Sequence, residues 1–308
     1  MSQFLRDLQE GKKPDGVPPV GGAPKESVGD KSDVGMGSGP AQPPGASPGP
    51  GSISWGPMRK TGSPQLCSFV YDGDLKTPIV PIVPGIDVSH YQPKMNWGAV
   101  IAAGFKFAII KATDGTGSKS STYDKQRLDA HQNGLIVGSY HFARFGGLTP
   151  KQESEHILKV TGGVRVGELP LTIDCEWDRY NKNYDESSET MDEPAALEIL
   201  EILERVESAT KMTPILYCSY PFFRGFKNPE RFFRFHPWNP AYWRSGKEPG
   251  KKENRINGPK VPLPWSKSFC WQWTDMHPAA KSITGDNNLD GNFFNGTLAQ
   301  LSAMCRQQ

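Results

Sequence analysis

The chain has 308 residues and a nearly balanced charge, with 35 Lys and Arg against 33 Asp and Glu, so its formal net charge is +2. This balance argues against a protein that binds nucleic acid or a membrane surface. No apolar run approaches the ~20 residues that span a bilayer, and the amino terminus lacks the apolar core of a signal peptide. We therefore expect a protein made in the cytoplasm, with no membrane span and no signal peptide.

The cysteines and histidines give no sign of a metal site. The five cysteines contain no Cys-x-x-Cys spacing, and three of them lie inside apolar strand-like runs, so buried free thiols are expected. The six histidines are scattered, and none is spaced from another His or from a Cys as zinc ligands are. We expect neither a metal nor a cofactor.

The chain divides into three parts by composition. Residues 1–57 are mostly Gly, Pro, Ser and Ala, and such a segment buries too little apolar surface to fold, so a flexible tail is expected. This tail either tethers the protein or is simply disordered. Residues 58–84 are transitional, with short extended pieces that pack on the next domain, although their prolines argue against a central strand. Residues 85–308 have the regular pattern of a folded domain.

In this domain, apolar strands alternate with helices. Strands are predicted at 83–89, 105–111, 135–142, 169–177 and 214–219. Each is nearly all apolar, which is typical of a parallel sheet covered on both faces. An open doubly wound sheet and a closed barrel both fit this pattern. A dinucleotide-binding fold does not, because no G-x-G-x-x-G follows the first strand.

The intervening helices carry start and stop signals. Asn96 is the expected N-cap of one helix and Gly104 its end. Thr149, Pro150 and Gln152 predict a capping box at the start of another. Asp192 is expected to cap a long helix with one buried stripe, formed by Ile199, Ile202, Leu203 and Val206.

The last third of the chain is poor in helix. Strand candidates lie at 237–243 and 269–273, with no convincing helix between them. Residues 244–266 are rich in Lys, Gly and Pro and predict a loop. Its basic residues either touch anionic groups of a substrate or form a solvated insertion. Asp290 comes shortly before a pair of phenylalanines near the end of the domain.

The strand at 169–177 ends in two acids, Asp174 and Glu176, that project to the same face because side chains alternate along a strand. An isolated pair of this kind is more often a helix cap or a surface pair than a site. Here Asp87 and Asp290 also lie at strand ends, and the carboxyl ends of parallel strands meet at one edge. Four converging acids repel one another, so at least one is expected to stay protonated near neutral pH. An acid with a raised pKa beside charged carboxylates is what the protonation of a glycosidic oxygen requires.

Aromatic side chains are expected around this cluster. Tyr140, Tyr217, Trp271 and Trp273 lie in or beside the predicted strands and would surround the mouth of the site. Aromatic rings suit the stacking of sugars, although they also fill cores.

Several segments together resemble glycoside hydrolase family 25, the Chalaropsis-type lysozymes that cut bacterial peptidoglycan. The matching segments occur in the family's order over roughly residues 85–297: GIDVSHYQ at 85–92 with Trp97, FAIIKAT at 107–113, GSYHF at 138–142, DCE at 174–176, ILY at 215–217, WQWT at 271–274 and LD at 289–290. The resemblance implies a modified TIM-like (β/α)5β3 barrel. It also implies hydrolysis of the β-1,4 bond between N-acetylmuramic acid and N-acetylglucosamine.

The resemblance assigns roles to the four acids. Glu176 matches the family's general acid, and Asp174 matches the carboxylate that orients the substrate's 2-acetamido group or a water. Asp87 and Asp290 match two supporting acids on the floor of the cleft. Whether the reaction retains or inverts the anomeric configuration is left open. Asp114 departs from the family's usual Glu and is expected to contact substrate.

Other functions are weighed against this one. A non-catalytic glycan-binding or structural module on the same barrel is the main alternative, and the complete set of acids argues against it. A muramoyl amidase would need a zinc site that the histidines do not supply. Without a signal peptide, delivery to the wall is expected through a phage holin, a virion or a secretion machine, and the tail suits tethering to the last two. A phage lysin is the favoured context.

Overall fold

The computed structural model describes residue 58 and residues 65–66, 81–147, 149–176, 193–223, 226–242 and 258–308. The predicted tail at 1–57 lies outside the described residues, as do most of segment 58–84, the expected cap Asp192 and residues 244–257 of the basic loop.

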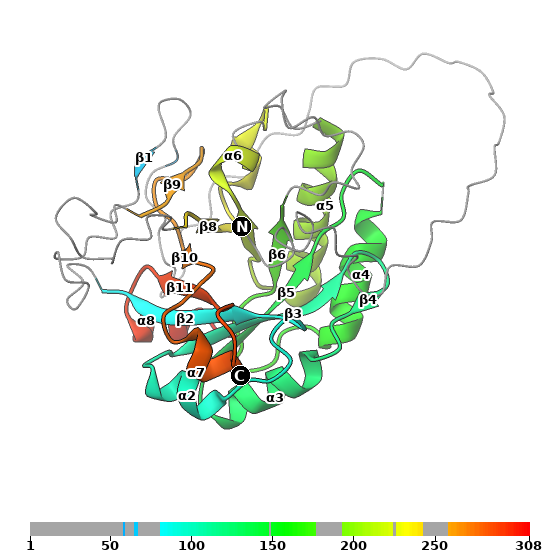
Figure 1. Ribbon diagram of the computed structural model, residues 1–308. Helices are drawn as coiled ribbons and strands as arrows, with labels where there is room; N and C mark the ends of the chain where they lie inside the picture. The colour runs from blue at the N-terminus through cyan, green and yellow to red at the C-terminus, as the bar shows by residue number, and fades with distance from the viewer. Residues whose placement is uncertain are drawn as a thin grey trace, which may run out of the picture.

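Eight of the described strands close into a barrel (Figure 1). In spatial order they are β2 (Val83–Val88), β11 (Asp290–Phe294), β10 (Cys270–Thr274), β8 (His236–Pro240), β7 (Ile215–Cys218), β6 (Thr172–Cys175), β5 (Ile136–Phe142) and β3 (Phe107–Asp114), and β3 pairs again with β2. Among them β11 alone runs antiparallel to both of its neighbours. The closed form decides between the two predicted arrangements and excludes the open sheet.

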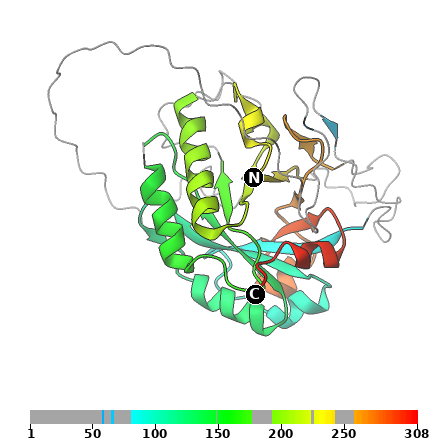
Figure 2. The ribbon, with the colours of Figure 1, turned by 180° about the vertical axis from the view of Figure 1, so that it is seen from behind.

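A helix follows each of the first five barrel strands along the chain. These helices are α2 (Trp97–Ala102), α3 (Tyr123–Gln132), α4 (Pro150–Thr161), α5 (Glu193–Thr210) and the short α6 (Tyr220–Phe223). Among the described residues no helix lies between β8 and β10, and β10 and β11 are separated only by the five-residue helix α7 (Ala280–Thr284), which agrees with the predicted (β/α)5β3 order. Figure 2 shows α4 and α5 side by side on the outside of the barrel.

The remaining elements are short. They are β4 (Ser118–Lys119), which extends β3 as a hairpin, the 3-10 helix η1 (Pro229–Phe232), α7 (Ala280–Thr284) and α8 (Leu298–Ala303). A separate pair of strands joins β1 (Gln65–Leu66) to β9 (Lys260–Val261). The sequence predictions did not include η1, α6, α7 or α8.

Apolar residues on the outer face of the barrel hold the helices in place. The predicted stripe of Ile199, Ile202, Leu203 and Val206 on α5 is buried in one cluster, and a second cluster lies under α2, α3 and α7. Burial of one such side chain contributes ~1.5–3 kcal/mol. The four described cysteines are buried and free, as expected, and three of them lie in barrel strands. None of the described helices is long and apolar enough to cross a membrane.

The predicted helix caps have different outcomes. Asn96 caps α2 as expected, because its Oδ1 accepts a hydrogen bond from the amide of Ala99 at 3.1 Å. The capping box at Thr149 is wrong, since the Thr149 hydroxyl donates to the Glu153 carboxylate at 3.2 Å and caps no backbone amide. Glu153 is held in place by the buried ring of His141, 2.9 Å away. A complete capping box occurs at Thr297 of α8 instead.

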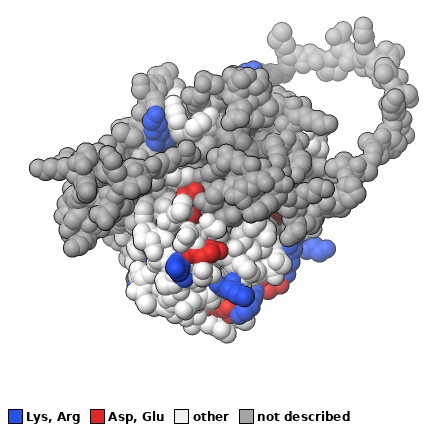
Figure 3. All heavy atoms as spheres, viewed as in Figure 1, with Lys and Arg blue, Asp and Glu red and all other residues white. Residues whose placement is uncertain are grey.

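Charge is mixed on the described surface. On the face in Figure 3, most described atoms belong to uncharged residues, and basic and acidic side chains lie near one another in the lower part of the view. This distribution agrees with the balanced composition, which predicted no dominant basic face.

Candidate active site

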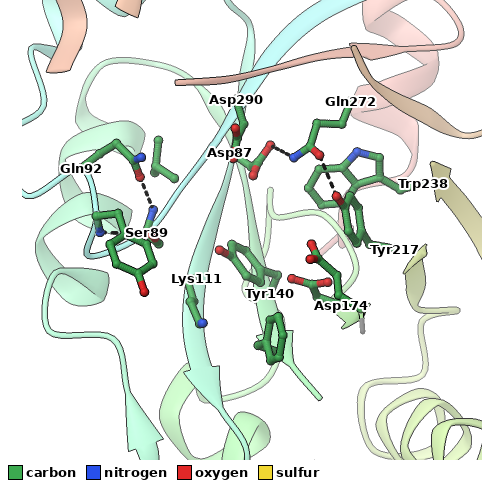
Figure 4. Close-up of a pocket in the computed structure, with 14 residues that line it drawn as sticks. Asp87, Ser89, Gln92, Lys111, Tyr140, Asp174, Tyr217, Trp238, Gln272 and Asp290 are labelled. Carbon is green, nitrogen blue, oxygen red and sulfur yellow. Dashed lines mark hydrogen bonds between the residues drawn. The ribbon is translucent and has the colours of Figure 1, made fainter. Parts of the chain in front are cut away.

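The four predicted acids lie together in one pocket at the carboxyl ends of the parallel strands. Asp87, Asp174, Glu176 and Asp290 all line this pocket, which encloses about 520 Å³ including space open to solvent. Figure 4 shows Asp87 and Asp290 together, with Asp174 across the pocket and Tyr140 and Tyr217 beside it. The structure therefore brings together acids from both ends of the domain's sequence.

Strand direction explains how these acids meet. Asp87 is near the carboxyl end of β2 and pairs in register with Asp290, the first residue of β11. Because β11 is antiparallel, its first residue lies at the end of the barrel where the parallel strands finish. Asp174 of β6 and Glu176, the residue directly after β6, face the pocket, while Cys175 between them packs into the core. The predicted alternation along this strand is confirmed.

Amide groups hold the Asp87 carboxyl. Its Oδ1 accepts hydrogen bonds from Gln272 Nε2 at 2.9 Å and from Asn292 Nδ2 at 2.6 Å. Burial raises the pKa of Asp87, and the hydrogen bonds from Asn292, Gln272 and Asp290 oppose that rise. Asp87 is thus a buried carboxyl in a polar environment built by the last two barrel strands.

The surroundings of Asp174 differ from those of Asp87. Burial, followed by the negative charge of Glu176, raises the pKa of Asp174 well above its ordinary value, and the Lys111 ammonium opposes this effect. Among the described residues, none forms a hydrogen bond with the buried Asp174 Oδ1. The charge of a neighbouring acid thus adds to burial in raising the pKa of Asp174, whereas burial is the cause of the rise at Asp87.

Two of the predicted aromatic residues line the pocket. Tyr140 and Tyr217 are both there, and burial and the nearby carboxylates raise the pKa of both hydroxyls well above 10. Both tyrosines therefore remain neutral at physiological pH. The Tyr217 hydroxyl donates to Gln272 Oε1 at 2.7 Å.

The two predicted tryptophans of β10 are not among the residues that line the pocket. Trp271 donates from its indole to the Ala241 carbonyl at 3.0 Å, and Trp273 stacks on Phe293 with ring centroids 5.5 Å apart. Side chains alternate along a strand, and on β10 Gln272 is the residue that points inward. The tryptophans on either side of Gln272 therefore point away from the four acids.

Asp114 lies beside the pocket rather than in its lining. It accepts hydrogen bonds from Lys111 Nζ at 2.8 Å and from Arg144 Nε at 2.7 Å. Burial raises the pKa of Asp114, but the positive charges of Lys111 and Arg144 lower it by more, so the net shift is downward. Lys111 itself lines the pocket and contacts the Phe142 ring, with the ammonium 4.7 Å from the ring centroid.

Several pocket residues were missed by the sequence predictions. They are Ser89, Tyr91, Gln92, Lys111, Trp238 and Gln272, and behind them lies the buried Asn292. A polar residue inside an otherwise apolar strand was the available signal for Lys111 and Gln272. The loop after β2 is fixed from α3, where Gln126 Nε2 donates to the carbonyls of Ser89 at 3.0 Å and Gln92 at 2.9 Å.

The carboxyls of the pocket differ from a set of metal ligands. Within the part of the chain that the structure describes, no group of three or more His, Cys, Asp and Glu is placed to hold a metal ion. What the pocket does offer is a set of carboxyls with different surroundings, which suits proton transfer and the stabilisation of a developing positive charge.

Comparisons with known proteins agree on one family. The model of the family described as Glycosyl hydrolases family 25 matches residues 86–281. Lysozyme M1 of Streptomyces globisporus is 27% identical over 226 residues, which are 72% of this chain and 71% of that protein. An N,O-diacetylmuramidase of Arthroderma benhamiae is 30% identical over 227 residues, which are 73% of this chain and 87% of that protein.

Solved structures show the same fold. A family 25 lysozyme from Aspergillus fumigatus aligns with a TM-score of 0.60 and 26% identity, over 73% of this chain and 99% of that one. A bacterial lysozyme from Streptomyces coelicolor aligns with a TM-score of 0.61 at 24% identity, over 72% of this chain and 96% of that one. Because the family model covers residues 86–281 and the relatives align over nearly the same barrel, the chain belongs to glycosyl hydrolase family 25 and is a glycoside hydrolase of the lysozyme class.

Proposed function

We propose that this enzyme cleaves the β-1,4 bond between N-acetylmuramic acid and N-acetylglucosamine in bacterial peptidoglycan. The observation that carries the proposal is the convergence of Asp87, Asp174, Glu176 and Asp290 in one pocket of a lysozyme-family barrel. Hydrolysis of a glycosidic bond requires a proton donor for the leaving oxygen and a negative group that stabilises the positive charge on the sugar. A pocket with several carboxyls can supply both.

In this proposal Glu176 is the general acid. It follows β6 at the carboxyl end of the barrel and lines the pocket together with Asp174, two residues before it. General acid catalysis by a positioned side chain contributes typically about 10²–10⁴-fold in rate. Loss of the Glu176 proton donor therefore removes most of the activity while the fold remains.

Asp174 assists by holding the substrate's 2-acetamido group or a water. Support comes from its buried Oδ1, which has no hydrogen-bond partner among the described residues. An unsatisfied buried polar group costs about 1–3 kcal/mol. A substrate group that pairs with this oxygen would recover that cost on binding, which favours a role in orienting the reacting atoms.

The test is the substitution Glu176→Gln. We expect loss of peptidoglycan lysis by about two orders of magnitude or more, with an unchanged melting temperature and retained binding to cell walls. Mass spectrometry of the wild-type digest should find muramic acid at the new reducing ends. Retained lysis by the variant would remove Glu176 from its role, and glucosamine at the reducing ends would make the enzyme a glucosaminidase.

Delivery to the wall rests on composition. We infer that residues 1–57, which are rich in Gly, Pro and Ser, tether the enzyme to a virion or a secretion machine. An antibody against the chain should then detect it in purified particles. Its presence in cell lysates alone would instead support release through a holin.

A further inference from the structure

A pair of amides surrounds one oxygen of Asp87. Gln272 Nε2 and Asn292 Nδ2 both donate to Oδ1, at 2.9 and 2.6 Å, and the two amide side chains are buried. We call Gln272 and Asn292 the amide cradle. Gln272 lines the pocket, whereas Asn292 is completely buried behind it and is not a lining residue. Asn292 therefore acts on the pocket only through its neighbours.

The orientation of Asn292 is fixed by a tryptophan. The Trp238 indole Nε1 donates to Asn292 Oδ1 at 3.0 Å. An indole nitrogen is a donor only, so the amide oxygen must face Trp238 and the amide N–H groups must face Asp87. Gln272 is oriented in a similar way, because the hydroxyls of Tyr217 and Tyr242 both donate to its Oε1 at 2.7 Å. Figure 4 shows the bonds from Tyr217 to Gln272 and from Gln272 to Asp87.

The cradle determines where a proton can lie. With two N–H groups directed at it, Asp87 Oδ1 can accept hydrogen bonds but has no acceptor to which a proton of its own could be donated. Asp290 lies beside Asp87, because the two residues are register partners on β11 and β2 and both line the pocket. Two neighbouring carboxyls repel each other when both are ionised, so the pair favours a state with one shared proton. That proton is therefore carried by Asp87 Oδ2 or by Asp290.

We propose that Asn292 is a positioning residue for the glycosidic reaction: through Asp87 it keeps the Asp87–Asp290 pair at one proton and one negative charge, with Oδ1 always unprotonated. This inference rests on the proposed function. A pair fixed in this state gives the pocket a constant negative charge near the sugar ring, and it prevents a second proton from neutralising that charge at moderately acidic pH.

Removal of the Asn292 donor should let the pair take up its second proton at higher pH. Burial raises the pKa of Asp87, and the hydrogen bond from Asn292 is the first of the interactions that oppose the rise. The other titratable groups around Asp87 remain in the variant, namely Lys111, Tyr140, Asp174, Glu176, Tyr217, Cys270 and Asp290. The surroundings of Asp87 in the variant therefore differ from those in the wild type by the loss of one hydrogen bond.

The experiment compares Asn292→Ala with a matched control, Asn239→Ala. Asn239 of β8 is equally buried, donates to the Cys218 carbonyl at 3.0 Å and accepts from the Ser268 hydroxyl at 2.9 Å, and it does not line the pocket. In the Asn292 variant we expect the acidic limb of the kcat/KM–pH profile to move upward by about one to two pH units. The control should lose a similar amount of thermal stability with its acidic limb unmoved.

Two additions keep the test decisive. Asn292→Asp retains an oxygen for Trp238 and removes the amide donor, so it should move the limb in the same direction even if the alanine variant does not fold. Carbon-13 NMR titration of aspartate-labelled protein, with Asp87 assigned through Asp87→Asn, follows the carboxyl itself and should show the same upward shift. This readout needs no activity, so it is independent of whether the wild type cleaves peptidoglycan.

Three results would each overturn one part of the proposal. If the Asp87 titration and the acidic limb of the kcat/KM–pH profile are unchanged in both Asn292 variants, the amide cradle does not control the protonation of the Asp87–Asp290 pair. An equal movement of the limb in Asn239→Ala would assign the effect to general loosening of the barrel. A wild type that fails to release muropeptides would refute the proposed function alone, while the NMR titration would still decide the role of Asn292.

Discussion

Replacement of Asp174 by asparagine should make the protein more stable at neutral pH. The unfolded chain ionises this carboxyl near 3.8, whereas burial and Glu176 hold the native pKa well above that value. The native state therefore binds the proton up to a higher pH than the unfolded state does. Stability contributed by this group is complete below 3.8, falls as the pH rises toward the native pKa, and is level above it.

The direction of the effect follows from this difference in pKa. The amide in Asp174→Asn is neutral at every pH, and Lys111 keeps its ion pair with Asp114 at 2.8 Å. Asp174 Oδ1 already lacks a partner among the described residues, so the amide adds little new penalty. A buried acceptor without a partner costs about 1–3 kcal/mol, and more when it is charged. We expect removal of the charge to give a net gain of that order at pH 7, or about 2–4 °C in Tm for each kcal/mol.

Urea denaturation between pH 4 and pH 8 measures this gain, and lysis assays should show that the stabilised variant is nearly inactive. Asp114→Asn is the matched control of opposite sign. Despite its burial, Asp114 has a lowered pKa because of Lys111 and Arg144. Its contribution is therefore present above 3.8 and lost as the pH falls, and the variant should be destabilised by about 2–3 kcal/mol at pH 7. A gain at Asp174 that does not grow with pH, or a loss there, would refute the reasoning.

Two further predictions concern groups outside the set of acids. Gln126→Ala removes the two hydrogen bonds that fix the loop 89–92. We therefore expect KM to rise several-fold with a smaller change in kcat, and amide hydrogen exchange in that loop to become faster. Unchanged KM and unchanged exchange would contradict the role of Gln126. Glu153→Ala leaves the buried His141 ring without its carboxylate at 2.9 Å, so we expect a loss of about 3–5 kcal/mol by denaturation. Activity per folded molecule should persist, and a stable but inactive variant would place Glu153 in the reaction instead.

Local patterns in the sequence were sufficient to predict the alternation of strands and helices, whereas the choice of a closed barrel over an open sheet came from the resemblance to family 25. Each apolar strand of the first five is followed by a helix, and this periodicity depends only on residues close together in the chain. The acids were predictable for the same reason. Asp174 and Glu176 share a face by strand alternation, and Asp87 ends a buried strand, so the carboxyl ends of the strands bring them together.

The amide cradle and the orientation of β10 could not be predicted in this way. Asn292 and Asp87 are 205 residues apart in the chain, and their contact depends on how the last strand pairs with the first. On β10, either Gln272 or its two tryptophan neighbours can point inward, and only the register with β11 decides. At Thr149, the motif fitted a capping box, but a distant buried His141 binds Glu153 and the hydroxyl of Thr149 follows that carboxylate.

The antiparallel strand β11 has a consequence for when the enzyme becomes active. It inserts between β2 and β10 and brings Asp290 to Asp87, so the pocket is completed by the contact between the first and last strands of the barrel. Contacts between residues so far apart in the sequence form slowly, because the ends of a long chain segment must be brought together, at a cost in entropy, before the contact stabilises the fold. Because Asp290 and Asn292 both lie on this last strand, the complete set of pocket acids and the amide cradle exist only when the first and last strands of the barrel are paired.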